Sequence, residues 1–493
     1  MTSTSSRQDP SVVIIGAGMT GIQLVIKLKQ AGIKNIIVLE KTHDVGGTWR
    51  ENTYPGICCD VPSHAYTYSF EPNPEWSSFF PSGSEIHAYF KKVTKKYEVE
   101  KHIRFNQLVT RCVYDEESNT WAISNADGEV LQADLLFSAT GILHQPVIPD
   151  ISGLDSFAGA KFHSSQWDHD VDLIGKRIGV IGTGSTATQI IPELVKLAGS
   201  KISVFQRTAQ WIVKMDNRDF SDKEKQQFRD QPKRMERIRT WSARFWAQGT
   251  AALVSDRWFD RLTHKLVSWN GLRYLNKSIK DPELRAKLTP DYTFGCKRVV
   301  INPLFYDAIQ QANVDLITEN IDRIEPDGIV TKDGVLHPLD ILVMATGFDA
   351  TAFMRPMEFI GKSGVTIEQA WAKKFNAYRS MFLPDFPNFF LMLGPNSPIG
   401  NQSIIEISEI QTEYAIKLID QWRAGKLQTI AAKPEAMQAW ASMLKERMGH
   451  TVWTSGCQSW YLDSEGDALA WPDKWSKWVA AMQTPDLSDF VQN

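Results

Sequence analysis

Short apolar runs alternate with longer stretches of helical pattern in two parts of this 493-residue chain. Val12–Ile15 and Asn35–Leu39 flank one such stretch, and Ile178–Ile181 and Ile202–Phe205 flank another. A short apolar run beside a glycine-rich turn is typical of a buried parallel strand, and the stretch between two runs is typical of a crossover helix. The pattern therefore predicts an α/β fold with two strand–helix–strand units.

The first strand of each unit ends in a glycine-rich turn. The two turns are Gly16-Ala-Gly18-Met-Thr-Gly21 and Gly182-Thr-Gly184-Ser-Thr-Ala187. In such a turn the first glycine permits the tight bend and the second lets the backbone approach a pyrophosphate. The third position, glycine or alanine, lets the helix pack against the strand. We predict two Rossmann-like dinucleotide-binding domains; the alternative for each turn is a glycine-rich bend in some other βα unit.

The residues after the second strand of each unit distinguish the two nucleotides. Glu40 ends the first pair, and its carboxylate can accept hydrogen bonds from a ribose 2′-hydroxyl, as FAD or NAD would offer. Gln206, Arg207 and Thr208 end the second pair, and a guanidinium suits the 2′-phosphate of NADPH. The alternative for Arg207 is a solvated surface arginine. Because the second site takes NADPH, we assign FAD to the first.

An internal repeat predicts where each unit ends. Residues 134–141 and 340–347 both run from an aspartate through an apolar strand to Ala-Thr-Gly. Between residues 214 and 293 the sequence is helical, charged and rich in tryptophan, and we interpret it from its position as an insertion that walls a substrate pocket. Aromatic pairs at i, i+4 spacing in it, such as Trp241 and Phe245, predict core packing. The predicted division is 1–148 and 351–493 for the FAD-binding domain, 149–213 and 296–350 for the NADP-binding domain, and 214–295 for the helical insertion.

Composition limits the partners and the location of the protein. Hydrophobic content of 43% and charged content of 23% are those of a soluble globular protein. The net charge of −3 favours neither nucleic acid nor an anionic membrane as a partner. We expect no signal peptide, and no apolar run reaches the roughly 18–20 residues that a membrane span needs. Five cysteines without a CxxC pair predict reduced thiols, a cytoplasmic location and no dithiol chemistry. Neighbouring Cys58 and Cys59 are either a redox couple or small buried residues beside a cofactor.

Two longer motifs indicate more closely which class of dinucleotide-binding protein this is. Gly46-Gly47-Thr48-Trp49 leads to Asp60, and residues 157–168 read Phe-x-Gly-x-x-x-His163-x-x-x-Trp167-Asp. Together they resemble the paired fingerprints of type I Baeyer–Villiger monooxygenases, and Trp167 favours this branch over the related flavin-containing monooxygenases. The segments at residues 294–298 and 459–461 are similar to the family's catalytic and late NADP-contacting motifs. The segment 288–292 and the overall length resemble the 4-hydroxyacetophenone type.

The resemblance implies a reaction. NADPH reduces FAD, dioxygen adds to give a flavin peroxide, and attack on a small-molecule ketone inserts oxygen to form an ester or lactone. Arg298 is the expected cation beside the developing negative charge, and Asp60 is expected to orient it. On an extended segment Lys297 points the other way, toward Arg207 and the 2′-phosphate. The protein is expected to be a monomer or a small homo-oligomer.

The resemblance also implies the cofactor-binding residues. His163 is expected to have a structural or hinge role rather than to act as a base, and Asn401 and Gln402 either contact the flavin or belong to an ordinary loop. The expected cofactor-binding set is Gly16, Gly18, Thr20, Gly21, Glu40, Lys41, Gly47, Thr48, Trp49, Asp60, Val61, Tyr66, Val109, Ala139, Thr140, Gly141, Gly182, Thr183, Gly184, Ser185, Thr186, Gln189, Arg207, Thr208, Lys297, Arg298, Asn401, Gln402 and Trp460.

Two other functions fit the two nucleotide loops. A heteroatom monooxygenase would form sulfoxides or N-oxides and would not need Arg298 in the same way. A non-catalytic flavoprotein would bind both cofactors as a redox sensor, although the presence of Asp60, Arg207 and Arg298 argues against such a loss of activity. No metal site is predicted.

Overall fold

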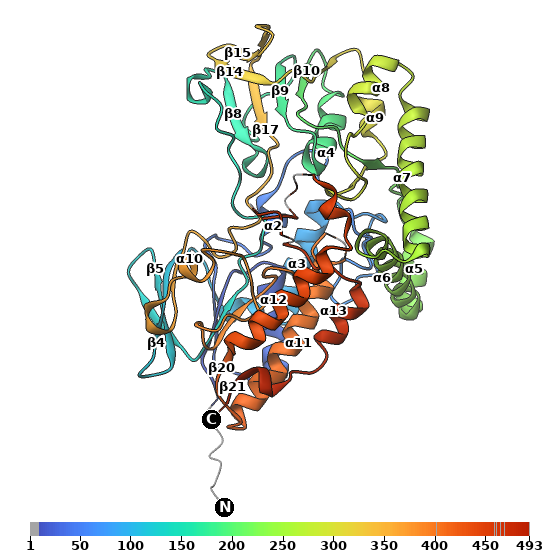
Figure 1. The fold of residues 1–493 in the computed structure, drawn as a ribbon. Helices are drawn as coiled ribbons and strands as arrows, with labels where there is room; N and C mark the ends of the chain where they lie inside the picture. The colour runs from blue at the N-terminus through green and yellow to red at the C-terminus, as the bar shows by residue number, and fades with distance from the viewer. Residues whose placement is uncertain are drawn as a thin grey trace, which may run out of the picture.

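The computed structural model describes residues 9–400, 402–457, 459, 461–463, 465–467 and 469–492. Two parallel sheets form the centres of two units, one above the other in Figure 1. Both ends of the described chain lie at the lower unit. The predicted α/β fold with two Rossmann-like units is confirmed.

The lower unit contains the first glycine-rich loop. Its parallel sheet has the order β19-β7-β1-β2-β3, and helix α1 (Met19–Gln30) connects β1 to β2. Helix α11 (Ile404–Arg423) packs beside α1, where Gln23 Nε2 donates to Thr412 Oγ1 at 2.7 Å. The chain after residue 350 therefore returns to complete the first unit. The strands are β1 (Val12–Ile15), β2 (Ile36–Leu39), β3 (Ile103–Arg104), β7 (Leu135–Ser138) and β19 (Phe389–Leu391).

The upper unit repeats this plan around the second loop. Its parallel sheet has the order β13-β10-β9-β17-β8, and α4 (Ser185–Leu194) connects β9 to β10. Except for the exposed Arg177 at the start of β9, the residues of β9 and β17 are apolar or glycine and buried, as expected for strands covered on both faces. The strands are β8 (Ala160–His163), β9 (Arg177–Ile181), β10 (Lys201–Phe205), β13 (Val314–Ile317) and β17 (Ile341–Met344).

Antiparallel strands precede both strands that lead into Ala-Thr-Gly, β7 and β17. The first group comprises β4 (Val109–Asp115), β5 (Thr120–Asn125) and β6 (Val130–Ala133), and β18 (Glu358–Ile360) joins its edge. The second group comprises β14 (Ile321–Glu325), β15 (Gly328–Thr331) and β16 (Leu336–Pro338). The remaining elements include α2 (Thr48–Glu51), α3 (Gly83–Lys96), α9 (Phe305–Ala308), α10 (Ile367–Ala370), α12 (Pro434–Met448), α13 (Trp475–Ala481), β11 (Ile212–Val213), β12 (Val300–Ile301), β20 (Leu427–Ala432) and β21 (Phe490–Gln492).

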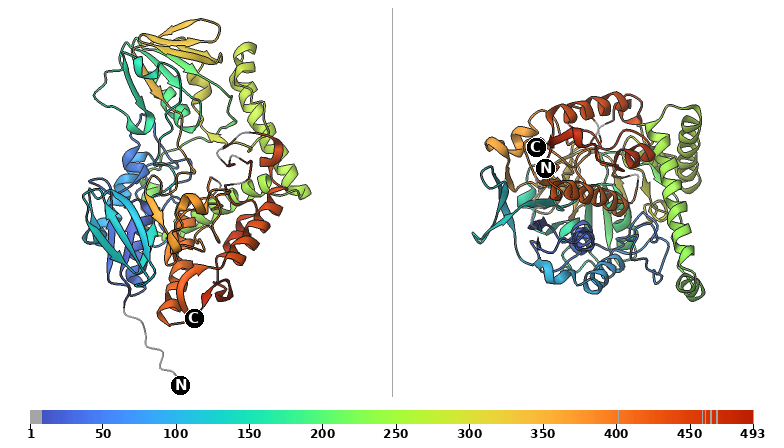
Figure 2. Two further views of the ribbon diagram at one scale, coloured as in Figure 1. Left: turned by 60° about the vertical axis from the view of Figure 1, so that its left-hand side comes forward. Right: turned by 90° about the horizontal axis from the view of Figure 1, so that it is seen from below.

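The segment between β11 and β12 is helical. It contains α5 (Asp222–Asp230), α6 (Pro232–Val254), α7 (Trp258–Ser278) and α8 (Pro282–Leu288). Helices α6 and α7 form the outer edge of the molecule in the view from below (Figure 2). None of the helices in the described part of the chain has the length and apolar character that crossing a bilayer requires.

One prediction about this insertion is wrong. Trp241 and Phe245 stack on each other, with ring centroids 5.5 Å apart, but they are 55% and 47% exposed rather than in the core. Spacing of i, i+4 places two side chains on one face of a helix, and it does not decide whether that face is covered.

Candidate functional site

A cavity of about 1580 Å³ lies between the two units and reaches both glycine-rich loops. It brings together almost every predicted site residue. Of the predicted residues within the described part of the chain, Gly21 alone does not line the cavity, because it packs beneath the first loop. Asn401 and Trp460 lie outside the described residues, although Ser459 and Tyr461 beside Trp460 line the cavity.

The first loop has the backbone that a pyrophosphate requires. Gly16 has a φ of +103°, and a Cβ there would lie 2.7 Å from the Ala139 carbonyl oxygen. A Cβ on Gly21 would lie 1.9 Å from the carbonyl oxygen of Gly16. Helix α1 begins after Gly18 with no side chain capping its first turn. Its N-terminal amide groups therefore point to the cavity without a side-chain acceptor, as a phosphate site needs.

Glu40 is held at the end of β2 by backbone and side-chain donors. Its Oε2 accepts from the Ala17 amide at 2.8 Å, and its Oε1 accepts from the Thr42 amide at 3.0 Å and hydroxyl at 2.7 Å. An ionised carboxylate has about four acceptor positions, so it can accept further hydrogen bonds. The fixed carboxylate lines the cavity, where it suits a ribose hydroxyl and repels a 2′-phosphate.

The second loop repeats the geometry of the first. Gly182 has a φ of +110°, and a Cβ there would lie 2.6 Å from the Ala345 carbonyl oxygen. Helix α4 begins after Gly184, again with no side-chain cap. The Thr183 hydroxyl donates to the Thr208 carbonyl at 3.1 Å and so ties the loop to the segment that follows β10.

Two cations lie together beside the second loop. Burial and the positive charge of Arg207 both lower the pKa of Lys297, although Asp291 partly opposes them. The Lys297 ammonium lies 4.9 Å from the centre of the Tyr292 ring, which keeps its side chain directed along this wall. Like charges are held together at a cost, and an anion between them would remove it. A phosphate dianion has the charge and the acceptor oxygens for this position.

Arg298 forms an ion pair with Asp60 at the meeting point of the two units. Arg298 Nη2 lies 2.6 Å from Asp60 Oδ2, and the two side chains are 31% and 22% exposed. The Asp60 charge raises the pKa of Arg298 further above its already high value, against the opposing effect of burial. The guanidinium therefore stays charged, and it stands at the cavity wall.

Tyr461 is a site residue that the sequence analysis does not single out. It is buried, it lines the cavity, and a hydrogen bond with Arg298 acts to lower its pKa, although burial raises that pKa overall. The tyrosine comes from the C-terminal part of the chain, far from Arg298 in sequence. Its position next to Trp460 in the late motif is the one signal that points to it.

The first fingerprint connects the two units. The Tyr54 hydroxyl donates to Gln189 Oε1 at 3.0 Å, and Gln189 Nε2 donates to the Cys58 carbonyl at 3.0 Å. A Cβ on Gly56 would lie 2.5 Å from the Gln189 carbonyl oxygen, so the segment packs directly on α4. Within the same segment, Trp49 Nε1 donates to the Tyr66 hydroxyl at 2.9 Å. The motif therefore shapes the boundary at which both nucleotide sites meet.

The second fingerprint, residues 157–168, lies away from the cavity. His163 is buried, and its ring nitrogens contact the Gly347 carbonyl at 3.0 Å and the Ser165 hydroxyl at 2.8 Å. Burial lowers the pKa of His163, which favours the neutral ring. Trp167 packs edge to face against Phe162 at 5.0 Å. His163 and Trp167 therefore hold this segment to the second unit, and neither lines the cavity.

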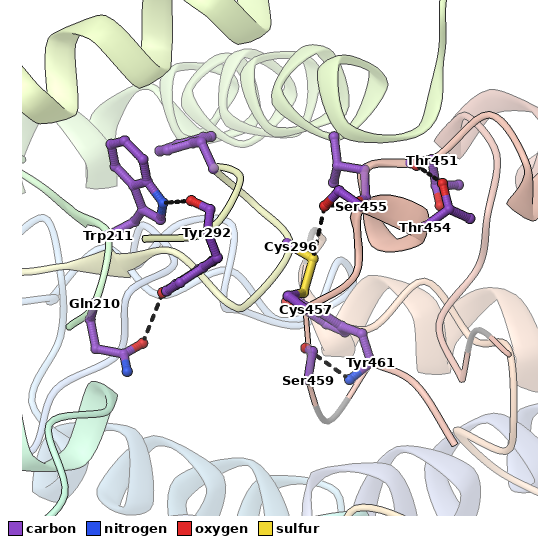
Figure 3. The surroundings of a disulfide bond; sticks show 12 residues. Gln210, Trp211, Tyr292, Cys296, Thr451, Thr454, Ser455, Cys457, Ser459 and Tyr461 are labelled. Atoms are coloured by element: carbon purple, nitrogen blue, oxygen red, sulfur yellow. Dashed lines mark hydrogen bonds between the residues drawn. A yellow bond between two sulfur atoms is a disulfide. The ribbon is translucent and has the colours of Figure 1, made fainter. Parts of the chain in front are cut away.

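A disulfide bond joins Cys296 to Cys457, 161 residues apart, which the sequence analysis does not predict (Figure 3). Figure 3 shows it between the segment of Tyr292 and the loop that bears Ser459 and Tyr461. The expectation that all five cysteines are reduced is wrong for this pair, since no local spacing marks so distant a partner. Cys58 and Cys59 are not disulfide-bonded, and burial raises the pKa of Cys58 to about 11. Both are therefore thiols, with Cys59 buried and Cys58 half-buried.

The loop before α11 supplies a hydrogen-bond donor to the cavity. Gln402 is buried and lines the cavity, and within the described part of the chain its Nε2 has no hydrogen-bond partner. A buried amide donor without an acceptor is costly, so this group fits a polar ligand in the cavity. The uncapped helices, the two loops and this donor together fit the two dinucleotides.

The fold and the cavity define a protein that holds two dinucleotides face to face, the arrangement of flavoprotein oxidoreductases. Residues 9–222 match the flavin-binding monooxygenase-like family. An uncharacterised monooxygenase of Mycobacterium tuberculosis (strain ATCC 25618 / H37Rv) is 43% identical over 94% of this chain and 92% of its own length. A Baeyer–Villiger monooxygenase of Streptomyces coelicolor is 37% identical over 97% of this chain and 92% of its own.

A crystal structure of OTEMO in complex with FAD and NADP superposes with a TM-score of 0.87 at 29% identity, covering 96% of this chain and 97% of that one. The chain belongs to the Baeyer–Villiger monooxygenases of the flavin-binding monooxygenase-like family. It is a flavin-dependent monooxygenase whose cofactors are FAD and NADP.

Proposed function

We propose that this enzyme uses NADPH and dioxygen to insert an oxygen atom beside a ketone carbonyl, and that Arg298 is its catalytic cation. The observation that carries the proposal is the Arg298–Asp60 ion pair at 2.6 Å, in the wall of a cavity that reaches both nucleotide loops. When bound, FAD supplies the chemistry that activates dioxygen, and NADPH supplies the hydride that reduces FAD.

Arg298 is suited to stabilise negative charge on the oxygen of a carbonyl substrate. A fixed donor aimed at developing charge in a partly buried site contributes about 3–4 kcal/mol. An arginine side chain keeps its proton near neutral pH, so it stabilises the negative charge without protonating the oxygen. Asp60 is the positioning residue: it holds the guanidinium in place and compensates its burial.

The two ends of the cavity bind the two nucleotides in this proposal. The first loop, Glu40 and Gln402 hold FAD, and the second loop with Arg207 and Lys297 holds NADPH. The first fingerprint, packed on α4 through Gln189, keeps the two sites in contact. A ketone then lies between Arg298 and the inner side of α6 and α7, which also line the cavity.

The test is an Arg298→Ala variant of the holoenzyme assayed with NADPH on a panel of ketones and sulfides, with products identified by mass. We expect ester formation to fall about 10²- to 10³-fold, with flavin content unchanged. Arg298→Lys is expected to restore part of the rate, since it keeps a charge but not the fork that pairs with Asp60.

The matched control is Arg177→Ala. Arg177 forms an arginine–aspartate pair of the same 2.6 Å length with Asp340, outside the cavity, so its loss tests the effect of removing such a pair elsewhere. Sulfoxidation that survives in Arg298→Ala while ester formation is lost supports the assignment. Equal loss of both activities, or ester formation within threefold of wild type, contradicts it.

A further inference from the structure

The outer face of α7 is apolar although it faces away from the molecule. Trp258 is 77% exposed, and Phe259, Leu262, Leu266 and Trp269 are each about half exposed. At about 100° per residue these five side chains lie within roughly a third of the helix circumference. Helix α7 thus has this apolar face on one side, and Thr263, His264 and Val267 on its other side line the cavity.

Helix α6 extends this surface. The stacked, exposed rings of Trp241 and Phe245 belong to the same helical pair, and the two helices pack on each other. We call the exposed apolar side chains of the two helices the hairpin face. Large apolar patches on a protein surface mark binding sites for proteins, ligands or membranes.

Positive charges lie along one flank of the hairpin face. Arg257, Arg261 and Lys265 on α7, and Arg237 and Arg244 on α6, are exposed. Within the described residues no carboxylate lies within 4.0 Å of any of these five cations. The chain as a whole has a net charge of −3, so this positive charge is a local feature of the hairpin.

Exposed acids are scarce on the two helices and at their connection. They are Glu236 and Asp256, and the carboxylate of Asp256 lies 3.3 Å from His450. The remaining acid of α7, Asp260, is buried and paired with Lys474 at 2.7 Å. The hairpin face is therefore apolar at its centre and cationic along one flank.

We propose that the hairpin face docks on an anionic phospholipid surface. Exposed tryptophan, phenylalanine and leucine side chains partition into the interface between head groups and acyl chains, and lysine and arginine beside them bind anionic head groups. A second copy of the chain fits less well, because a two-fold contact through this face would bring two surfaces of the same positive charge together.

The position of the cavity gives this docking a consequence. Phe245 belongs to the hairpin face and also lines the cavity, as do Trp246, Leu253 and Val267 from the inner side of the hairpin. Phe245 therefore lies both on the docking face and at the cavity. We propose that a lipophilic ketone dissolved in the bilayer enters beside Phe245; this entry rests on the proposed function, whereas the docking does not.

The experiment is flotation of the full-length holoenzyme with vesicles of phosphatidylcholine alone and of phosphatidylcholine with phosphatidylglycerol. We expect binding to the anionic vesicles, weaker binding to the neutral ones, and loss of binding as salt is raised. The double variant Arg261→Gln/Lys265→Gln is expected to bind about 25-fold more weakly, since each cation near the surface contributes about fivefold. Trp258→Ser with Trp269→Ser is expected to abolish binding.

Matched controls are Ile174→Ser and Lys332→Gln, which change an exposed apolar residue and an exposed cation on the second unit, away from the hairpin. Both are expected to bind as wild type does. Flavin content and oxidation of a water-miscible ketone without vesicles report separately on folding and on the proposed function. Absence of binding to anionic vesicles overturns the proposal. A wild-type protein that does not bind vesicles but forms a dimer in analytical ultracentrifugation, which Trp258→Ser disrupts, would show that a second copy covers this face instead.

Discussion

The two dinucleotide loops share a backbone geometry and differ in the charge that follows them. Gly16 and Gly182 have φ angles of +103° and +110°, and a Cβ on either would lie within 2.7 Å of the carbonyl of an Ala-Thr-Gly strand. Helices α1 and α4 both begin after a glycine with φ of −72° and no side-chain cap. The pyrophosphate requirement is therefore the same in both units.

The two units differ in the charged residues that follow the second strand of each unit. In the first unit the Glu40 carboxylate is fixed by the Ala17 amide. In the second unit Arg207 lies close enough to Lys297 to lower its pKa. A pyrophosphate is common to FAD and NADP, whereas a 2′-phosphate belongs to NADP alone, so one loop design serves both nucleotides and a few charged side chains select between them.

The largest effect on nucleotide binding is expected when the first glycine of one loop at a time is replaced. Gly16→Ala forces an L side chain into a strained backbone region against Ala139, and we expect flavin binding to weaken more than about 100-fold. Gly182→Ala makes the same change at Ala345, and it should leave flavin bound but weaken NADP binding. Flavin absorbance per polypeptide and NADP titration measure the two effects. Loss of flavin in both variants to the same extent would show that the loops are not independent.

The next effect concerns the choice between NADPH and NADH. Removing the Arg207 charge in Arg207→Gln eliminates charge-assisted hydrogen bonds worth about 1.5–3 kcal/mol, or roughly 10- to 100-fold in kcat/KM for NADPH. The value for NADH should not change, because it has no 2′-phosphate. Glu40→Gln is the control in the other unit and should leave this preference intact. An equal loss with both nucleotides would place Arg207 outside the phosphate site.

The smallest effect is a pH dependence of NADP binding. Burial and Arg207 lower the pKa of Lys297, so its charge, present below that pKa, is lost as pH rises through it. NADP affinity should therefore fall a few-fold on the alkaline side. Lys297→Arg keeps its charge at these pH values and should move the decline to higher pH. Titration of NADP affinity against pH measures it, and identical alkaline limbs in wild type and variant would exclude Lys297 as the titrating group.

The two nucleotide units were predictable from the sequence alone. The glycine turns, the apolar strands beside them and the residues Glu40 and Arg207 are all local features, because a β-strand, the turn after it and the next strand lie within about thirty residues. The repeat ending in Ala-Thr-Gly marked the last strand before each connection. The structure confirms the α/β architecture that these signals predict.

The contacts between distant segments were not predictable in this way and are seen only in the folded protein. The Arg298–Asp60 distance, the Cys296–Cys457 disulfide and the position of Tyr461 join parts of the chain more than 150 residues apart. Resemblance to a family pointed to the first of these, and no periodicity or spacing pointed to the second. Contacts of this kind depend on how whole units pack, which local propensity does not encode.

The hairpin gives the same lesson for surfaces. Periodicity aligned Trp241 with Phe245 on one face of a helix, and the fold left that face uncovered. The pattern of a helix fixes which side chains share a face, because 3.6 residues make a turn. Which face is buried depends on what the rest of the chain brings against it, and that is settled only when the tertiary structure forms.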